Sequence, residues 1–199
     1  MHRAALSGFA AGAAMMIGGA LGAVSNTDPR PIMDANAGIM NPMIAGQAML
    51  PDRSVMDNIA ASPEHGQLTA ALRDSGIAAA MKANAQFTLF APTDAAFKAS
   101  GGPKNSLAER MGYLVVPGNY DSQALLRAIG EGGGRAKLRT LEGGILTARL
   151  NGPTNIQLMD EQGNTANIAI YDIHDKNGVT HVIDHMVQPA GSPRQLARS

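Results

Sequence analysis

The chain has 199 residues, of which 45% are hydrophobic, and its 16 basic residues balance 16 acidic ones. This length fits one domain with tails, and the balanced charge argues against a nucleic-acid-binding protein. Aromatic residues make up only 4% of the chain and cysteine is absent, which disfavours a stacking platform for bases or sugars and excludes disulfides, thiolate metal sites and a cysteine nucleophile.

The N-terminal segment has the features of a secretory signal peptide. Arg3 is followed by an uncharged stretch rich in Ala, Gly, Met and Leu, and small residues offer cleavage after Ser25 or after Ala20. We therefore expect residues 1–25 to be a signal peptide and the mature protein to be periplasmic or secreted. The alternative is an uncleaved membrane anchor, because the apolar stretch is long enough to span a bilayer.

Residues 26–53 are rich in Pro, Asn, Gly, Ala and Met and show no clear hydrophobic period, so we predict a flexible leader. Met40 and Met43 have the spacing of half a copper(I) site, since soft thioether sulfur suits that ion. The simpler interpretation is an apolar tail that docks on the domain, because methionine adapts to irregular surfaces. We predict no metal site and no cofactor.

Helix signals begin at Ser54, which is placed to cap the first helix. Ser62-Pro63-Glu64 predicts the start of a second helix, which ends at Gly76. The run FTLFAP, residues 87–92, has apolar side chains on both faces and predicts a central strand. Further elements are predicted as helices at 77–82, 94–99 (capped by Thr93), 107–113 and 122–129 (capped by Asp121 or Ser122), and as a strand at 114–117.

From Lys137 onward the hydrophobic period changes to two. Strand-like segments separated by turn-forming residues follow at 137–141, 145–151, 155–160, 167–173 and 178–187. Helices followed by a run of antiparallel strands predict the α+β class, with a helical layer against an antiparallel sheet or sandwich. The residues at 190–199 are polar, and we predict a loose C-terminal tail.

Three histidines near the C-terminus, His174, His181 and His185, raise the question of a metal site. Two histidines four residues apart share one face of a helix, but on a strand they lie about 13 Å apart, too far for one ion with bonds of about 2 Å. Because residues 179–187 are rich in β-branched side chains, we predict a strand and no site formed by His181 and His185 alone. A site between His174 and His181 across a hairpin is the alternative.

Common catalytic signatures are absent from the sequence, which has no GxSxG, no Walker loop, no HExxH and no GxGxxG before a helix. Asp94 and Asp184 are conceivable as an acid pair. We interpret Asp94 as a helix cap and Asp184 as a hydrogen-bond partner of backbone or turn groups, because a catalytic assignment needs convergent geometry. We predict that the protein is not an enzyme, and a hydrolase that uses these two carboxylates and the histidines is a weaker alternative.

Two sequence blocks together resemble the fasciclin-like adhesion domain. FTLFAPTDAAF, residues 87–97, is similar to the first homology block of that family, and NGVTHVID, residues 177–184, is similar to the second. GYLVVPG, residues 112–118, looks like the segment between them. The resemblance covers residues 54–189, which we take as the domain. The positions of the structural motif are Phe90, Thr93, Asp94, Asn177, Gly178, His181 and Asp184.

The resemblance implies a fasciclin-like β-sandwich or wedge of antiparallel strands flanked by several short helices. It also implies that the two homology blocks are neighbouring core strands, in which His181 and Asp184 help to close the sheet. The chain departs from the family pattern at Leu114, where histidine is usual, at Thr180, where an aliphatic residue is usual, and in residues 98–112, where the family has a longer segment.

The resemblance also implies function by contact, since most members of the family are extracellular or periplasmic adhesion modules without catalysis. An Asp-Ile pair linked to integrin contact in animal members matches Asp172-Ile173, and Tyr113 matches the tyrosine of the central segment. These three residues are therefore predicted partner contacts, although Asp172-Ile173 is equally interpretable as a shared feature of the fold. The signal peptide and the single-domain size look like those of bacterial exported members, which have no integrins of their own.

We therefore expect an exported, non-enzymatic cell-adhesion or surface-interaction module in the envelope or extracellular matrix. Its partner would be a protein or glycan, not nucleic acid, and it would meet the membrane only through its N-terminal segment. The alternative function is a periplasmic binding protein for a small apolar ligand, in which the shortened segment at 98–112 uncovers a cleft that the Met-rich leader lines.

Overall fold

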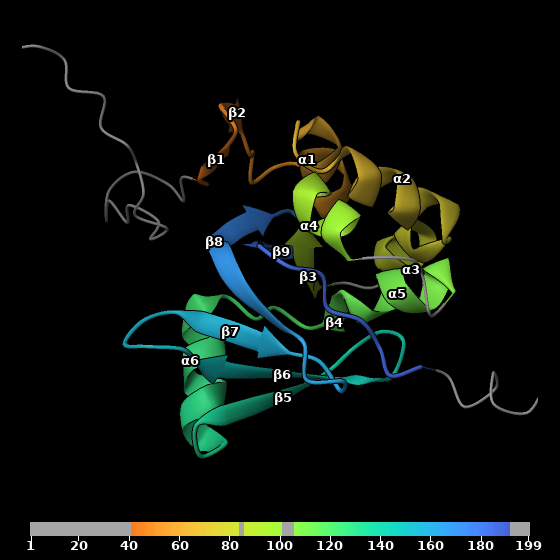
Figure 1. Ribbon diagram of the computed structural model, residues 1–199. Coiled ribbons are helices and arrows are strands. Elements are labelled where there is room, and N and C mark those ends of the chain that lie inside the picture. The colour runs from red at the N-terminus through yellow and green to blue at the C-terminus, as the bar shows by residue number, and fades with distance from the viewer. Residues whose placement is uncertain (1–40, 84–85, 101–105, 192–199) are drawn as a thin grey trace, which may run out of the picture.

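The computed structural model describes residues 41–83, 86–100 and 106–191, and Figure 1 shows the arrangement of their elements. The predicted α+β class is confirmed. The helices are α1 (Val55–Ala61), α2 (Gly66–Asp74), α3 (Ile77–Ala83), α4 (Asp94–Ala99), α5 (Leu107–Tyr113) and α6 (Ser122–Glu131). The strands are β1 (Met43–Ile44), β2 (Gln47–Ala48), β3 (Phe87–Pro92), β4 (Val115–Pro117), β5 (Arg135–Arg139), β6 (Ile145–Leu150), β7 (Ile156–Met159), β8 (Thr165–Asp175) and β9 (Gly178–Ile183).

Apart from the β1–β2 hairpin, the described strands form one seven-stranded sheet with the order β4-β3-β9-β8-β7-β6-β5. This order does not confirm the predicted sandwich. The two ends of the sheet approach each other, since the Leu141 amide just after β5 donates to the Val115 carbonyl of β4 at 2.7 Å. The sheet is therefore nearly closed, and its inner face holds most of the hydrophobic core.

The sequence predicted an antiparallel sheet, but β3 and β9 pair in parallel. The prediction is therefore wrong for this pair of strands. Antiparallel neighbours can be joined by a hairpin, whereas parallel strands need a long connection. All the chain between residues 93 and 177 serves as that connection here. Both strands are fully buried along their length, which confirms that the apolar run at 87–92 is a central strand.

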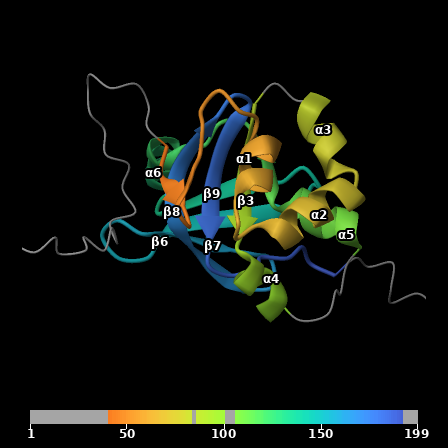
Figure 2. The same ribbon diagram turned by 90° about the horizontal axis from the view of Figure 1, so that it is seen from above.

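The helices cover two separate parts of the sheet. In Figures 1 and 2, α1 to α5 gather beside β3 and β9, whereas α6 packs behind β5 and β6. Hydrophobic side chains of both groups join one cluster, in which Leu68 and Leu72 of α2 and Leu125 and Ile129 of α6 are almost fully buried. The amphipathic helices thus close the core that the curved sheet leaves open.

Local capping explains where most helices start. The side chains of Ser54, Thr93 and Asp121 each accept a hydrogen bond from the backbone of the first turn, as predicted. The predicted start of the second helix is wrong, because α2 begins at Gly66 rather than at Ser62-Pro63-Glu64. The Ser62 hydroxyl is instead hydrogen-bonded to Nδ1 of His65 at 2.7 Å, and the segment between them is a turn.

The last part of the predicted flexible leader, residues 41–53, packs against the domain. Ile44 and Met49 are buried against Ile173 and Val182 in a second, smaller hydrophobic cluster. This agrees with docking of an apolar tail, the simpler interpretation of these methionines. The predicted signal peptide, Met40 of the proposed copper pair and the tail from residue 192 lie outside the described residues.

Candidate functional site

The two homology blocks lie side by side, as the resemblance implied. The β3–β9 register places Phe90 next to His181. The His181 ring stacks on Phe90 with centroids 5.6 Å apart and meets the edge of Tyr171 at 6.0 Å. His181 is 0% exposed, so this part of the second block is core rather than surface.

Both ring nitrogens of His181 have partners inside the protein. Nδ1 accepts from the Asp172 amide at 3.3 Å, and Nε2 lies 2.8 Å from the Tyr120 carbonyl, to which it donates. This pair of bonds requires the neutral ring with its proton on Nε2. Burial lowers the pKa of His181, while the Tyr120 carbonyl and the Asp172 carboxylate oppose that shift.

The geometry does not support a metal site that uses His181, either with His185 or with His174 across the hairpin. His181 has no free nitrogen lone pair, and the side chain of His185 is 67% exposed, with Nδ1 2.9 Å from the Asp184 carboxylate. Within the described residues, no group of three or more His, Asp and Glu side chains is arranged to hold an ion. The strand predicted at 178–187 ends at Ile183, so His185 lies in the bend after β9 and not on the same strand as His181.

Asp172 and Ile173 of the predicted contact pair are buried, with exposed fractions of 5% and 1%. Asp172 has φ +56° and lies at a bulge of β8. Its carboxylate accepts from the amide and hydroxyl of Ser122 at the start of α6, where a negative charge is favourable. The prediction that this pair contacts a partner conflicts with its burial, since the Asp172 carboxylate holds α6 and Ile173 packs under the β1–β2 hairpin.

Tyr113, the third predicted contact, is also buried. It is 0% exposed, and its hydroxyl donates to the Ile145 carbonyl at 2.7 Å. Burial raises the pKa of Tyr113, and nearby carboxylates raise it further. Leu114, at the position where the family usually has histidine, is 0% exposed as well. Tyr113 and Leu114 therefore join helix α5 to the sheet, and their side chains are not at the surface.

The remaining motif residues hold backbone segments together. Asp94 caps α2 as well as beginning α4, because its Oδ1 accepts from the Gln67 amide at 2.9 Å. Asn177 accepts from the Val55 amide at 3.0 Å, which ties α1 to the β8–β9 turn. Thr93 caps α4 and Gly178 lies against β3, where a Cβ atom would be 1.9 Å from the Phe87 carbonyl oxygen.

Asp184 binds the backbone of β8. Its carboxylate accepts from the amide and the side chain of Asn167, at 2.7 Å and 2.9 Å. Burial raises the pKa of Asp184, but the bonds from Asn167 and His185 outweigh burial and place the pKa below its usual range. Asp94 and Asp184 thus bind different backbone segments, the start of α2 and the strand β8.

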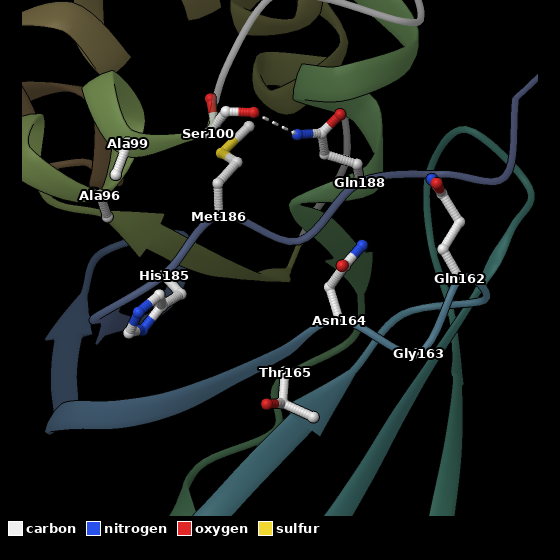
Figure 3. Close-up of a pocket in the computed structure, with 10 residues that line it drawn as sticks. All are labelled: Ala96, Ala99, Ser100, Gln162, Gly163, Asn164, Thr165, His185, Met186 and Gln188. Carbon is white, nitrogen blue, oxygen red and sulfur yellow. Dashed lines mark hydrogen bonds between the residues drawn. The ribbon is translucent and has the colours of Figure 1, made fainter.

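A polar pocket of about 460 Å³ lies between α4, the β7–β8 turn and the segment after β9 (Figure 3). Gln188 crosses it to donate to the Ser100 carbonyl at 3.3 Å. Gln162 donates to the Pro189 carbonyl and Asn164 to the Asp160 carboxylate, so these amides bind the protein itself. The lining residues are Ala96, Ala99, Ser100, Gln162, Gly163, Asn164, Thr165, His185, Met186 and Gln188.

Comparison with known proteins decides the family. Residues 63–189 match the family described as Fasciclin domain. The chain belongs to the fasciclin-domain family. Fasciclin domains are in general cell-adhesion modules without catalysis, and they are typically extracellular or secreted. The described helices include none that is long and apolar enough to cross a membrane.

Two individual matches agree with this assignment. This fasciclin-domain chain is 27% identical over 158 residues to Protein sll1483 of Synechocystis sp., and the alignment spans 73% of this chain and 79% of that protein. It also matches the structure of a FAS1 domain pair from the insect cell adhesion molecule Fasciclin I. That match has a TM-score of 0.50 and 16% identity, and it covers 61% of this chain and 44% of the insect chain. The second likeness shows the fold alone.

Sequence reasoning missed the polar groups that this fasciclin domain assembles from distant segments. Ser122 and Tyr120 complete the surroundings of Asp172 and His181, although some 50 to 60 residues separate them in the chain. The pocket likewise combines α4 with two later segments. The only local signal for the pocket was the turn at residues 161–164, which predicts a loop but not what it faces.

Proposed function

We propose that this fasciclin domain is an exported, non-enzymatic adhesion or surface-interaction module that contacts a protein or glycan in the envelope or matrix. The observation that carries the proposal is the family match over residues 63–189, which includes both homology blocks. The burial of the ionisable motif residues Asp172 and His181 adds support, because a buried and fully bonded group does not reach a substrate. Export rests on the N-terminal pattern of the sequence.

The pocket geometry favours this function over a carrier of small apolar ligands. Ligand sites for apolar molecules are lined mainly by hydrophobic and aromatic side chains. Most of the residues around this pocket are polar, and none of them is Phe, Tyr or Trp. The Met-rich leader contributes no described residue to its wall. Native mass spectrometry of protein purified from its own host is expected to give the mass of the chain without a tightly bound ligand.

A clean deletion of the gene in its own organism tests the adhesion proposal. We expect the deletion strain to show reduced surface attachment and aggregation, and the intact gene to restore both. A His185→Gln gene serves as the control against catalysis, because His185 is exposed and is among the residues that a hydrolase would use. It should restore attachment as well as the intact gene does. Unchanged attachment, aggregation and biofilm after deletion would contradict the proposal.

A further inference from the structure

Four cations lie on the outer face of the β5–β6 hairpin, which we call the basic face: Arg135, Lys137 and Arg139 of β5 and Arg149 of β6. The β5 strand alternates strictly, with exposed cations between the buried residues Ala136 and Leu138. Successive side chains of a strand point to opposite faces, so every second side chain lies on the same face, roughly 7 Å from the next. The strand therefore displays a straight row of positive charges.

The opposite, inner face of these strands is covered by helix. In Figures 1 and 2, α6 lies behind β5 and β6, and the other face of the sheet points toward the viewer of Figure 1. The buried residues of the two strands, Ala136, Leu138, Leu146 and Ala148, join Leu125 of α6 in the core. No described helix covers the basic face, so its charges are open to a partner.

The arrangement of charge on this face is unfavourable for the domain alone. Arg135 lies directly opposite Arg149 in the β5–β6 register, and like charges in that position destabilise a sheet. The Arg149 guanidinium is held by the Gln157 side-chain oxygen, at 3.1 Å and 2.7 Å, rather than by a carboxylate. Among the described residues, none of the four cations forms an ion pair.

The acidic residues of the same strands and turns lie at one end and bind backbone groups. Glu142 accepts from the Gly144 amide, and Glu161 accepts from the Ile145 amide. Asp160 is buried in the β7–β8 turn, where it accepts from the Gln162 and Asn164 amides. These carboxylates lie at the Arg139 end of the hairpin, and among the described residues none of them forms an ion pair with the four cations.

We infer that the basic face is the docking surface for an acidic polysaccharide, whose carboxylate or sulfate groups neutralise Arg135, Lys137, Arg139 and Arg149. This inference deepens the proposed function and rests on it. Protein interfaces depend on buried aromatic and apolar anchors, and stable membrane binding needs an inserted apolar group in addition to basic residues. The apolar residues of this face, Ile145 and Met159, are half-buried between strands. A linear polyanion matches a linear row of cations better than either alternative.

Affinity for defined polysaccharides tests the inference. The probes are polygalacturonate, which carries carboxylates, and dextran sulfate, with neutral dextran as the uncharged control. We expect the chain from residue 26 to 199 to bind one or both polyanions but not dextran, and binding to weaken as NaCl rises from 50 to 300 mM. The polyanion that the protein binds more tightly shows whether carboxylate or sulfate is the preferred anionic group.

Two triple variants with equal net charge locate the surface. Arg135→Gln, Lys137→Gln, Arg139→Gln removes the row of cations on β5, and we expect it to weaken polyanion binding about tenfold, since each exposed ion pair contributes little alone. Arg53→Gln, Arg73→Gln, Lys176→Gln removes exposed cations from other parts of the surface and should bind like the unchanged chain. Circular dichroism of each variant confirms that it is folded.

Several outcomes would overturn the inference. If the unchanged chain and the β5 variant bind the polyanion equally, the basic face is not the docking surface. The same conclusion follows if the matched control loses as much affinity as the β5 variant. Stronger binding to phosphatidylglycerol vesicles than to either polysaccharide would assign the face to a membrane. The two proposals can fail separately. If the protein binds polysaccharide through the basic face but gene deletion leaves attachment unchanged, the adhesion proposal is rejected and the docking surface is retained.

Discussion

Buried ionisable side chains in β8 and β9 fix backbone groups in this domain. Asp172 adopts the left-handed region, at φ +56°, which is unfavourable by about 1–2 kcal/mol for a residue with a side chain. Its bonds to Ser122 at the start of α6 offset that strain. Asp175 binds side chains instead, since it accepts from those of Asn58 and Thr180. The carboxylates therefore explain the local geometry without a catalytic function.

Asp175 makes the stability of the domain depend on pH. Burial raises the pKa of Asp175 from its usual 3.8 to about 6, although the bonds from Asn58 and Thr180 oppose this. Because the folded state holds the proton more tightly than the unfolded state, the stability present below pH 3.8 is lost as the pH rises toward 6. Ionisation of Asp175 lowers the free energy of unfolding by at most about 3 kcal/mol.

We predict that Asp175→Asn raises the free energy of unfolding at pH 7.5, by about 1–3 kcal/mol, and has little effect near pH 4. The amide keeps an acceptor for Asn58 and can donate to the Thr180 hydroxyl. Urea denaturation of both proteins from pH 4 to 8 measures the difference. A constant difference across this range would show that ionisation of Asp175 is not its cause.

Asp184→Asn is the control of opposite sign. The pKa of Asp184 lies below its usual range, so this carboxylate stabilises the fold above that range and loses its effect as the pH falls through the folded-state pKa. We expect this variant to be less stable than the unchanged protein at pH 7.5. Its deficit should shrink, rather than grow, in acid.

At the scale of elements, the hairpin β1–β2 shows how a segment without sequence periodicity becomes part of the fold. Asn41 holds its start by hydrogen bonds to both the amide and the carbonyl of His174. Ile44 and Met49 supply its buried contacts with Ile173. The hairpin lies outside the family match, which begins at residue 63, and it covers the β8–β9 end of the sheet.

Two substitutions in the same strand test whether the hairpin stabilises the domain. Ile44 is 0% exposed and Met43 is 61% exposed. We expect Ile44→Ala to lower the free energy of unfolding by about 2–4 kcal/mol and Met43→Ala to change it by less than about 0.5 kcal/mol. Urea denaturation checks both values. Equal and small effects would mean that the hairpin leaves the domain in solution.

The elements that sequence predicted are those whose signals are local. Ser54 and Thr93 each cap the helix that follows within a turn, and the two apolar faces of 87–92 require a buried strand. The helix start predicted at Ser62-Pro63-Glu64 was wrong because the Glu64 carbonyl accepts from the Asp94 amide. This contact, with a residue 30 positions away, holds the segment as a turn. The burial of Asp172 and the pocket also depend on distant segments, which one sequence does not reveal.

In the molecule as a whole, the parallel pair β3–β9 joins the helical half of the chain to the strands of the other half. Its register runs from Phe87 opposite Gly178 to Pro92 opposite Ile183. The first fasciclin block is β3 with the start of α4, and the second is β9 with the turn before it. A change at this pair should therefore affect the whole fold rather than one element.

Gly178→Ala tests this dependence. A Cβ atom at this position would lie 1.9 Å from the Phe87 carbonyl oxygen, and neither strand can move without breaking the core on both sides. We expect a loss of about 3 kcal/mol or more in the free energy of unfolding, with faster amide hydrogen exchange in both strands.

Gly130→Ala is the matched control, since it makes the same substitution in helix α6, where nothing lies within 4 Å of the added Cβ atom. It should stabilise the protein by about 0.5–1 kcal/mol, because alanine favours a helix interior over glycine. Opposite signs for the two variants would identify the β3–β9 contact as the cause. A Gly178→Ala protein as stable as the unchanged chain would contradict the close approach of these strands, and with it the parallel pairing that closes the domain.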